Sequence, residues 1–171
     1  MERNRGPGYS YRVQDVRLDP MTAGEFEDRL GAVMSEYVAE QIQVGNWSSS
    51  DAEELARVQQ RRLLPHGIET PGMHWYVART PPDQVVGFLW LATEPTDPIT
   101  GGAWIYAIEV DPHYRGRGLG RQLLQAAELE ARRLGATAIA LNVFGPNRVA
   151  RQLYESSGYD VTSLQMRKSL D

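Results

Sequence analysis

One stretch decides the fold of this chain, and it reads Ile108-Glu109-Val110-Asp111-Pro112-His113-Tyr114-Arg115-Gly116-Arg117-Gly118-Leu119-Gly120. A β-rich run that ends near Val110 passes into a glycine-rich turn, and an amphipathic helix is predicted from about Gly118 to Leu134. Glycine at positions 116, 118 and 120 lets backbone N–H groups approach a phosphate, and the helix N-terminus adds a partial positive charge. The stretch therefore predicts an anion-binding turn, although glycines that only satisfy unusual backbone angles would give the same spacing. It matches neither the dinucleotide fingerprint, because Arg121 stands where a third glycine is needed, nor a P-loop.

The rest of the chain predicts a mixed sheet flanked by helices. Strands are predicted over residues 11–18, 75–80, 84–92, 103–110, 138–143 and 159 to about 167. The first helix is predicted from Thr22, which can cap it, to about Val44, and three more over residues 51–64, 118–134 and 147–157. The serine cluster at 48–50 supplies a cap for the second. Residues 81–83 predict an antiparallel hairpin and 94–102 a turn-rich stretch, whereas the β-α-β-α-β order of the C-terminal half requires parallel pairing.

Composition excludes several classes of protein and of site. The chain has 171 residues, a net charge of −4 and no cysteine, which excludes a disulfide scaffold, a thiolate zinc site and a cysteine nucleophile within it. The acidic balance argues against a nucleic-acid partner, and no apolar run approaches the roughly 20 residues that span a bilayer. We therefore expect a cytoplasmic protein without a membrane partner, with a flexible tail over residues 1–10 and a single domain over residues 11–171. His66 and His74 lack metal-ligand spacing, so no metal site is predicted.

Two motifs lie in order along the C-terminal half of the chain. Residues 115–120 satisfy the pattern Gln/Arg-x-x-Gly-x-Gly/Ala without a departure. About 30 residues later, the pattern Asn-x-x-Ala-x-x-Leu-Tyr-x-x-x-Gly-Phe/Tyr is matched by Asn147, Ala150, Leu153, Tyr154, Gly158 and Tyr159. In both motifs the sequence resembles the GNAT superfamily of acyl-CoA-dependent N-acyltransferases, and two motifs in this order are far more specific than either alone.

The resemblance implies an α/β (α+β) fold of three layers, in which about four helices flank a central mixed sheet of six to seven strands. It also implies acetyl-CoA as the co-substrate, with main-chain amides of residues 117–120 on the pyrophosphate and the strand around Val110 beside the pantetheine arm. The charge agrees, because residues 113–151 hold seven Arg and two Glu, and Arg115, Arg117 and Arg121 are the expected phosphate partners. The cofactor-binding residues that the resemblance implies are Ile108, Val110, Arg115, Gly116, Arg117, Gly118, Leu119, Gly120, Arg121, Asn147, Ala150 and Tyr154.

Tyr154 is the candidate general acid. Attack of an amine on a thioester expels a thiolate, and a phenol with a pKa near 10 can give a proton to a group whose own pKa is near 8.5. Its position in the second motif favours this role, and the alternative is an aromatic residue of the core. Asn147 stands seven residues earlier on the same helix face, where we expect it to cap the helix as well as contact coenzyme A.

Glu109 is the candidate general base, because an alkyl amine is mostly protonated at pH 7 and must lose a proton. Many family members place a glutamate on this strand at positions that hold Trp104 and Tyr106 here. In a regular strand Glu109 faces away from Tyr106, and a β-bulge, which the family often has in this strand, would reverse that alternation. Glu36 or Glu40 of the first predicted helix, or a water chain without a dedicated carboxylate, are the alternatives.

The acceptor is predicted to be a small-molecule primary amine that carries a positive charge. Residues 19–54 hold nine acids and one arginine, and in this fold the first two helices border the acceptor cleft. A solvated acidic face would give the same pattern. Alternative functions are acetylation of a protein N-terminus or lysine, and a non-catalytic module that binds coenzyme A. An exposed edge strand at the C-terminus would permit a homodimer. An aromatic wall of the acceptor site is expected from among Tyr37, Trp47, Trp75, Trp90, Trp104 and Tyr106, most of which also fit a core role.

Overall fold

The computed structural model describes residues 16–93, 101–168 and 170. Three expectations lie wholly or partly outside these residues: the N-terminal tail, the start of the first strand (11–15) and most of the turn-rich stretch before residue 102. No helix among the described residues is both long and apolar enough to cross a membrane.

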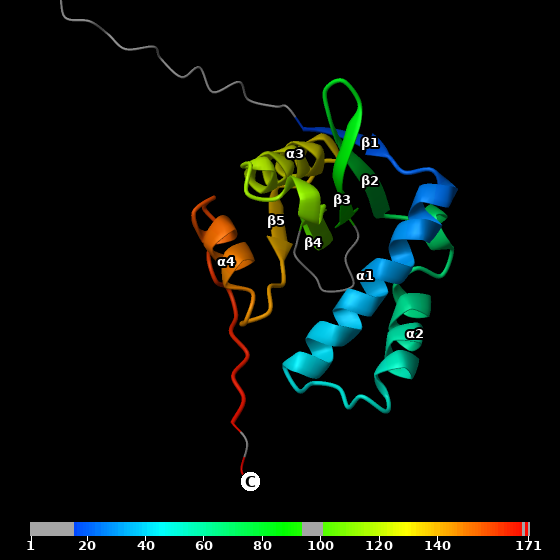
Figure 1. The fold of residues 1–171 in the computed structure, drawn as a ribbon, viewed down its shortest axis with the longest axis vertical. Coiled ribbons are helices and arrows are strands. Elements are labelled where there is room, and N and C mark those ends of the chain that lie inside the picture. Colours follow the sequence, from blue (N-terminus) through cyan, green and yellow to red (C-terminus); the bar gives the residue numbers. More distant parts are fainter. Residues whose placement is uncertain (1–15, 94–100, 169, 171) are drawn as a thin grey trace, which may run out of the picture.

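Five strands of the described chain form one mixed sheet in the order β1-β2-β3-β4-β5 (Figure 1). β1 to β4 pair antiparallel, and β4 pairs parallel with β5. The predicted hairpin and the predicted parallel crossover are both confirmed, because β2 and β3 meet across residues 81–83 and α3 connects β4 to β5. The strands are Arg17–Pro20, Met73–Thr80, Gln84–Ala92, Gly102–Val110 and Ala138–Leu141.

Within the part of the chain that the structure describes, four α-helices and two short 3-10 helices accompany the sheet. Thr22 caps α1, because its side chain accepts the Glu25 N–H while the Glu25 carboxylate accepts the Thr22 N–H. The predicted serine cap of α2 is wrong: Asp51 holds the cap position without a side-chain capping bond, and the hydroxyls of Ser48 and Ser50 donate to its carboxylate. The bounds are α1 Ala23–Gln43, α2 Ala52–Leu63, η1 Gly67–Glu69, η2 Pro112–Tyr114, α3 Leu119–Arg133 and α4 Arg148–Glu155.

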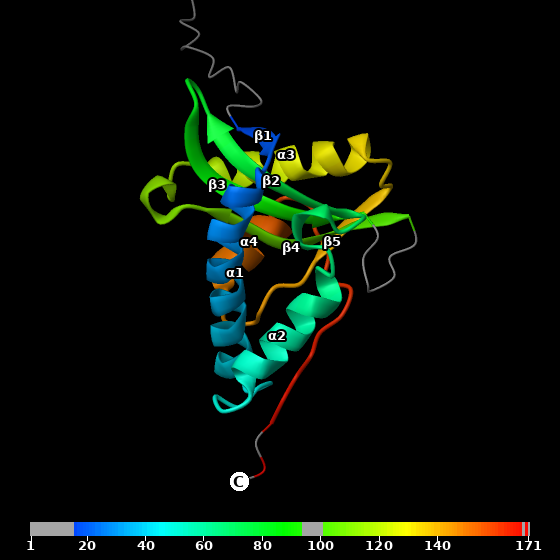
Figure 2. The ribbon, with the colours of Figure 1, turned by 90° about the vertical axis from the view of Figure 1, so that its right-hand side faces the viewer.

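The three layers are visible edge-on, with α3 on one side of the sheet and α1 and α2 on the other (Figure 2). Phe26 of α1 and Leu64 after α2 pack with Trp75 and Phe88 in one buried cluster. Leu124 and other apolar residues of α3, together with residues of α4, pack on the opposite face of the sheet. The near-continuous apolar runs of β2 and β3 supply side chains to both faces of the sheet, and both strands are buried except at and near the hairpin end and at His74.

The strand expected over residues 159–167 is absent from the sheet, so the described residues contain five strands instead of six or seven. Gly158, with φ at 92°, turns the chain out of α4, and the segment then runs away from the sheet (Figure 1). The guanidinium of Arg167 contacts the carbonyl of Gly45 in the α1–α2 loop. A strand-like sequence becomes a strand only beside another strand, and this path gives the segment no such neighbour within the described chain.

Candidate active site

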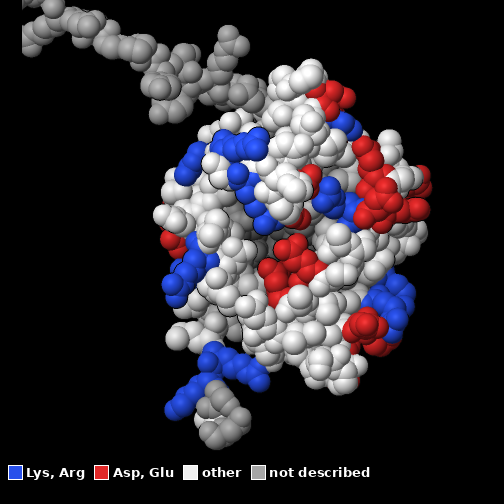
Figure 3. All heavy atoms as spheres, in the orientation of Figure 1, with Lys and Arg blue, Asp and Glu red and all other residues white. Residues whose placement is uncertain are grey.

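A cleft of about 820 Å3 opens where β4 and β5 separate. The parallel ladder between the two strands ends at the pair Ile105 and Leu141. Beyond it, the second half of β4, the chain after β5, α1 and the first turns of α3 and α4 line the cleft. Figure 3 shows acidic side chains gathered in a hollow in the middle of this face, with basic side chains above it. The lining includes every predicted site residue except Arg117, Gly118 and Arg121.

A β-bulge in β4 decides which way Glu109 faces. Tyr106 is an extra residue in the strand, because residues 90 and 91 of β3 pair with residues 107 and 105 of β4. The extra residue reverses the alternation of the side chains. Glu109 lies opposite Phe88, which packs on the α1 side of the sheet, and Tyr106 packs on that side too. The regular-strand arrangement, in which Glu109 faces away from Tyr106, is therefore wrong, and the bulged alternative is confirmed.

The Glu109 carboxylate is half-buried between charges of both signs. Arg115 donates from Nη2 to Glu109 Oε1 at 2.8 Å and from Nε to the Val110 carbonyl at 2.9 Å. Burial raises the pKa of Glu109, and the charge of Glu36 raises it further, whereas Arg115 and Arg29 act in the opposite direction. The net shift is upward, so this carboxylate retains a proton at higher pH than an exposed glutamate does.

Tyr154 lies on α4, where it serves both the core and the cleft. Its ring packs beside the apolar cluster under α3, at 5.8 Å from the ring of Tyr159, and it also lines the cleft. Burial raises the pKa of the phenol, and the negative charge of Glu40 raises it further. The phenol therefore keeps its proton throughout the neutral range. Asn147 caps the same helix as expected, because its Oδ1 accepts the N–H of Ala150 at 3.1 Å.

The glycine turn leaves open space in front of the N-terminus of α3. Gly116 and Gly118 have φ of 74° and 78°, and a Cβ at either position would meet no heavy atom within 4 Å. Gly118 is the N-cap of α3, and the first amides of any helix have no partner inside it. Space without side chains, free amides and the positive end of the helix dipole fit a diphosphate of the kind that coenzyme A carries. Gly120 has another use, since a Cβ there would lie 3.4 Å from Leu153 of α4.

The three arginines expected at the phosphates all contact protein groups. Arg115 is held by β4, as described above. Arg117 donates to the His113 carbonyl at 3.2 Å, and its guanidinium carbon lies 5.7 Å from the Tyr114 ring centroid. Arg121 reaches across to the end of α4, where it donates to the carbonyl and hydroxyl of Ser156 and to the hydroxyl of Ser157. Their contact with phosphate stays a prediction.

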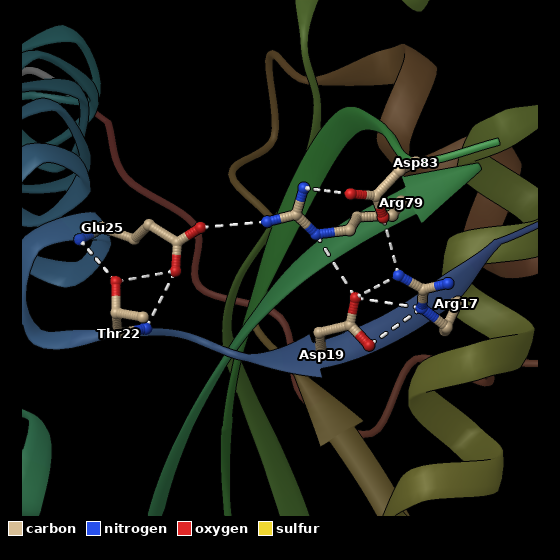
Figure 4. Close-up of polar contacts among 6 residues, drawn as sticks. All are labelled: Arg17, Asp19, Thr22, Glu25, Arg79 and Asp83. Carbon is tan, nitrogen blue, oxygen red and sulfur yellow. Dashed lines mark hydrogen bonds and ion pairs between the residues drawn. The ribbon is translucent and has the colours of Figure 1, made fainter. Parts of the chain in front are cut away.

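Only two of the nine acids between residues 19 and 54, Glu36 and Glu40, line the cleft. They lie one turn apart on α1 and face β4. Burial raises the pKa of Glu40, and the charge of Glu36 adds to the effect. Glu54 of α2 instead pairs with Arg57 and Arg61 on the surface. Two more of the nine acids belong to a separate cluster, the Arg79 network, which consists of Arg17, Asp19, Glu25, Arg79 and Asp83 (Figure 4).

The expected aromatic wall is divided between cleft and core. Tyr37, Trp104 and Tyr106 line the cleft. Trp75 and Trp90 are each 3% exposed and stack in the core at 4.4 Å. Trp47 packs edge-on against Tyr37 at 5.4 Å. Phe144, which the sequence reasoning missed, lines the cleft from the loop after β5, with its ring 6.5 Å from that of Tyr37.

An ion pair that the sequence reasoning also missed joins α1 to the chain after β4. Arg29 Nη1 lies 3.3 Å from Asp111 Oδ1, and the guanidinium carbon lies 4.7 Å above the Phe88 ring. This contact fixes α1 against the strand that carries Glu109. The available signal was that Arg29 is the one arginine among nine acids in its segment.

Comparison with known proteins gives a consistent result. The Acetyltransferase (GNAT) family matches residues 36–159. The N-acetyltransferase YycN of Bacillus subtilis, described as uncharacterized, is 36% identical over 155 residues, which cover 91% of this chain and 99% of the relative. The mycothiol acetyltransferase of Propionibacterium freudenreichii is 32% identical over 157 residues, which cover 92% of this chain and 47% of that enzyme.

Solved structures agree with these matches. The crystal structure of YycN from Bacillus subtilis aligns with a TM-score of 0.85 at 35% identity, over 91% of this chain and 98% of that one. The aminoglycoside antibiotic 6'-N-acetyltransferase AAC(6')-Ih from Acinetobacter baumannii aligns with a TM-score of 0.52 at 19% identity, over 91% and 99% of the two chains, which shows a shared fold.

Proposed function

The chain belongs to the acetyltransferase (GNAT) family, and from this premise we propose that it moves the acetyl group of acetyl-CoA to a small, positively charged primary amine in one ternary complex. The observation that carries the proposal is the cleft, which brings Glu109, Tyr154 and the glycine turn to one place. In the reaction the N–C bond of the amide forms and the C–S bond of the thioester breaks. An amine that enters as the ammonium loses two protons in all, of which one ends on the thiolate and the other is released to solvent.

The coenzyme would be held by the turn and by β4. The amides at the start of α3 bind its diphosphate in the open space before Gly116 and Gly118. The edge of β4 beyond Ile105 lies along the cleft, where Ile108 and Val110 take the pantetheine arm. Bound acetyl-CoA supplies the activated acetyl thioester.

Glu109 acts as the base that receives the proton of the amine. It lies on the acceptor side of the sheet because of the bulge, together with Glu36 and Glu40 of α1. Its raised pKa brings it closer to that of its partner, which makes proton transfer more favourable than for an exposed carboxylate. Arg115 keeps the carboxylate in a fixed orientation through the contact at 2.8 Å.

Tyr154 acts as the acid that gives a proton to the departing thiolate. It faces the cleft from α4, on the wall opposite α1. The raised pKa values of the two groups therefore support opposite roles. Glu109 on β4 accepts a proton more readily than an exposed carboxylate does, and the phenol of Tyr154 retains its proton until a thiolate forms.

The acceptor end of the cleft favours a cation with an apolar body. Glu36 and Glu40 supply negative charge, while Tyr37, Trp104 and Tyr106 supply aromatic surface. The test is a thiol-release assay with acetyl-CoA across diamines, amino sugars, amino acids, neutral amines and a peptide pool. Turnover of small cationic amines supports the proposal. Turnover of peptides alone would show that the acceptor is a peptide or protein and not a small molecule. No turnover with any amine would favour a module that binds coenzyme A without catalysis.

The coenzyme site has its own test. Gly118→Glu places a side chain and a negative charge in the open turn, so coenzyme A binding should be abolished when measured by calorimetry. Gly135→Glu is a matched control, because Gly135 also has a positive φ, at 92°, and open space around it, but lies beyond the other end of α3. Unchanged affinity in a folded Gly118→Glu variant would exclude the turn as the diphosphate site.

A further inference from the structure

A pair of aromatic rings joins two walls of the cleft on the side of the sheet where Glu109 lies. Phe144 stands in the chain between β5 and α4, and its ring centroid lies 6.5 Å from that of Tyr37 on α1, with the ring planes tilted by 54°. Both side chains line the cleft. Because α1 covers the face of the sheet that Glu109 shares with Phe88, the contact with Tyr37 places Phe144 on that face too.

The two strands carry Glu109 and Phe144 to opposite borders of the cleft. The parallel ladder ends at the pair Ile105 and Leu141. Beyond this pair β4 continues to Glu109, whereas the chain after β5 turns away and continues to Phe144. A molecule whose nitrogen lies at Glu109 therefore has Phe144 across the opening from it.

Both rings are anchored to helices. The ring of Trp47 packs edge-on against that of Tyr37 at 5.4 Å. The Tyr37 hydroxyl accepts a hydrogen bond from Gln59 Nε2 of α2 at 3.0 Å and lies 3.3 Å from Oε1 of the same side chain. The Phe144 carbonyl accepts the N–H of Asn147 at 2.9 Å, which ties the backbone of Phe144 to the start of α4. Supports of this kind make the pair of rings a fixed boundary of the cleft.

We propose that Tyr37 and Phe144 form the wall that limits how far an acceptor extends from the nitrogen that is acetylated, so that they select short amines over long ones. The inference rests on the proposed function, because it takes Glu109 as the position of the reacting nitrogen. Glu36 and Glu40 line the cleft on the same helix as Tyr37, so a short cationic amine keeps its charge near them without displacing a ring. A longer amine has to move a ring or hold its nitrogen short of Glu109, and either lowers kcat/KM.

Replacing Phe144 by a smaller and by a larger side chain tests the wall in both directions. The measured quantity is the ratio of kcat/KM for long unbranched diamines to that for short ones. Phe144→Ala should raise this ratio by at least about tenfold, and Phe144→Trp, which fills more of the cleft, should lower it. Tyr37→Ala should act like Phe144→Ala, and the two effects should not add, because the rings contact each other.

Leu129 of α3 supplies the matched control, since it is 44% exposed and is not among the residues that line the cleft. Leu129→Ala and Leu129→Trp should leave the ratio as it is in the unaltered chain. An unaltered chain that uses long and short diamines equally would overturn the wall, as would Phe144 variants that change kcat/KM by the same factor at every length. A changed affinity for coenzyme A in Phe144→Ala, measured by calorimetry, would also overturn it, because the ring would then belong to the coenzyme side of the cleft.

Binding of the same diamines to the chain saturated with coenzyme A, measured by calorimetry, repeats the series without chemistry. If no amine is turned over, the proposed acetyl transfer fails, whereas a length limit in binding that Phe144→Ala relaxes would still support the wall. Turnover of diamines with the same length dependence in every variant would overturn the wall and leave the proposed acetyl transfer standing. No binding of any diamine would overturn both.

Discussion

The Arg79 network and the cleft contain the same kinds of charged side chain, but the ratio of arginines to carboxylates differs between them. In the network two arginines meet three carboxylates, and Arg79 alone lies within 3.8 Å of Asp19, Glu25 and Asp83 (Figure 4). In the cleft three carboxylates, Glu36, Glu40 and Glu109, line one hollow, and Arg115 pairs with Glu109.

The pKa shifts of the two regions follow from this difference. The pKa of Asp19 is lowered, first by its hydrogen bond from Arg17, and that of Glu25 is lowered, first by the backbone N–H of Thr22. In the cleft the pKa values of Glu40 and Glu109 are raised, first by burial and then by Glu36. Paired carboxylates therefore stabilise the frame near β1, whereas the carboxylates of the cleft are those to which we assign cation binding and proton exchange in the proposed reaction.

The largest effect should come from removing the phenol that faces the carboxylates of the cleft. In Tyr154→Phe the ring and its packing remain while the proton donor is lost, so kcat should fall by roughly 10²–10⁴ and coenzyme A should bind nearly as before. Tyr159→Phe is the control, because its ring contacts that of Tyr154 but does not line the cleft. A near-normal kcat in Tyr154→Phe, with chemistry shown to be rate-limiting, would make Tyr154 a packing residue.

A smaller effect should follow when the carboxylates of α1 are neutralised. Glu36→Gln/Glu40→Gln should raise the KM of a cationic amine by roughly tenfold at low salt, since two charges near the acceptor are lost. Added salt should raise the KM of the unaltered enzyme for cationic amines more than for neutral ones. Glu53→Gln/Glu54→Gln on α2 is the matched control outside the cleft. Equal KM changes in the two double variants would leave the acidic face with a role in solubility only.

The coupling between Glu36 and Glu109 should appear as a shift in the pH profile. A base acts when deprotonated, so kcat at saturating amine should rise with pH as Glu109 ionises in the bound complex. Glu36 raises the pKa of Glu109, and Glu36→Gln should therefore move that rise to lower pH. Glu53→Gln should leave the profile in place. In Glu109→Gln the rise should disappear, and a retained rise would assign the base to another group.

Most of the frame is predictable from the sequence because its signals are local. The pair Pro81 and Pro82 bounds β3, which begins and ends as expected, and Thr22 caps α1. The two motifs lead to part of the cleft lining because they sit at the starts of α3 and α4, which face each other across Gly120 and Leu153.

The remaining features depend on contacts between segments that are far apart in the sequence, and a local sequence pattern carries no information about such contacts. The bulge at Tyr106 is a matter of pairing between β3 and β4, so the side of Glu109 stayed open until the register was known. Which acids of α1 line the cleft depends on the tilt of the helix over the sheet, and that tilt is fixed partly by the pair of Arg29 with Asp111. The prediction of a strand over residues 159–167 was wrong for the same reason, because the sequence pattern does not indicate which strand it would pair with.

The smallest effect should come from the paired region, where Arg79→Met removes the centre of the network. The carboxylates of Asp19 and Glu25 have lowered pKa values in the folded protein, so their stabilisation is present at neutral pH and is lost as pH falls through the acidic range. Arg79 contributes to both shifts, although Arg17 and Thr22 contribute more. Because these pairs are partly solvated, the variant should lose only about 1 kcal/mol of unfolding free energy near pH 7 in urea titrations. The difference from the unaltered protein should shrink at low pH, where protonated carboxylates no longer attract Arg79. Its kcat should not change, in contrast to every cleft variant that removes a proton-transferring group. Arg57→Met, which breaks one exposed pair on α2, should cost less, and an equal cost would show that the network is no more than a set of separate surface pairs.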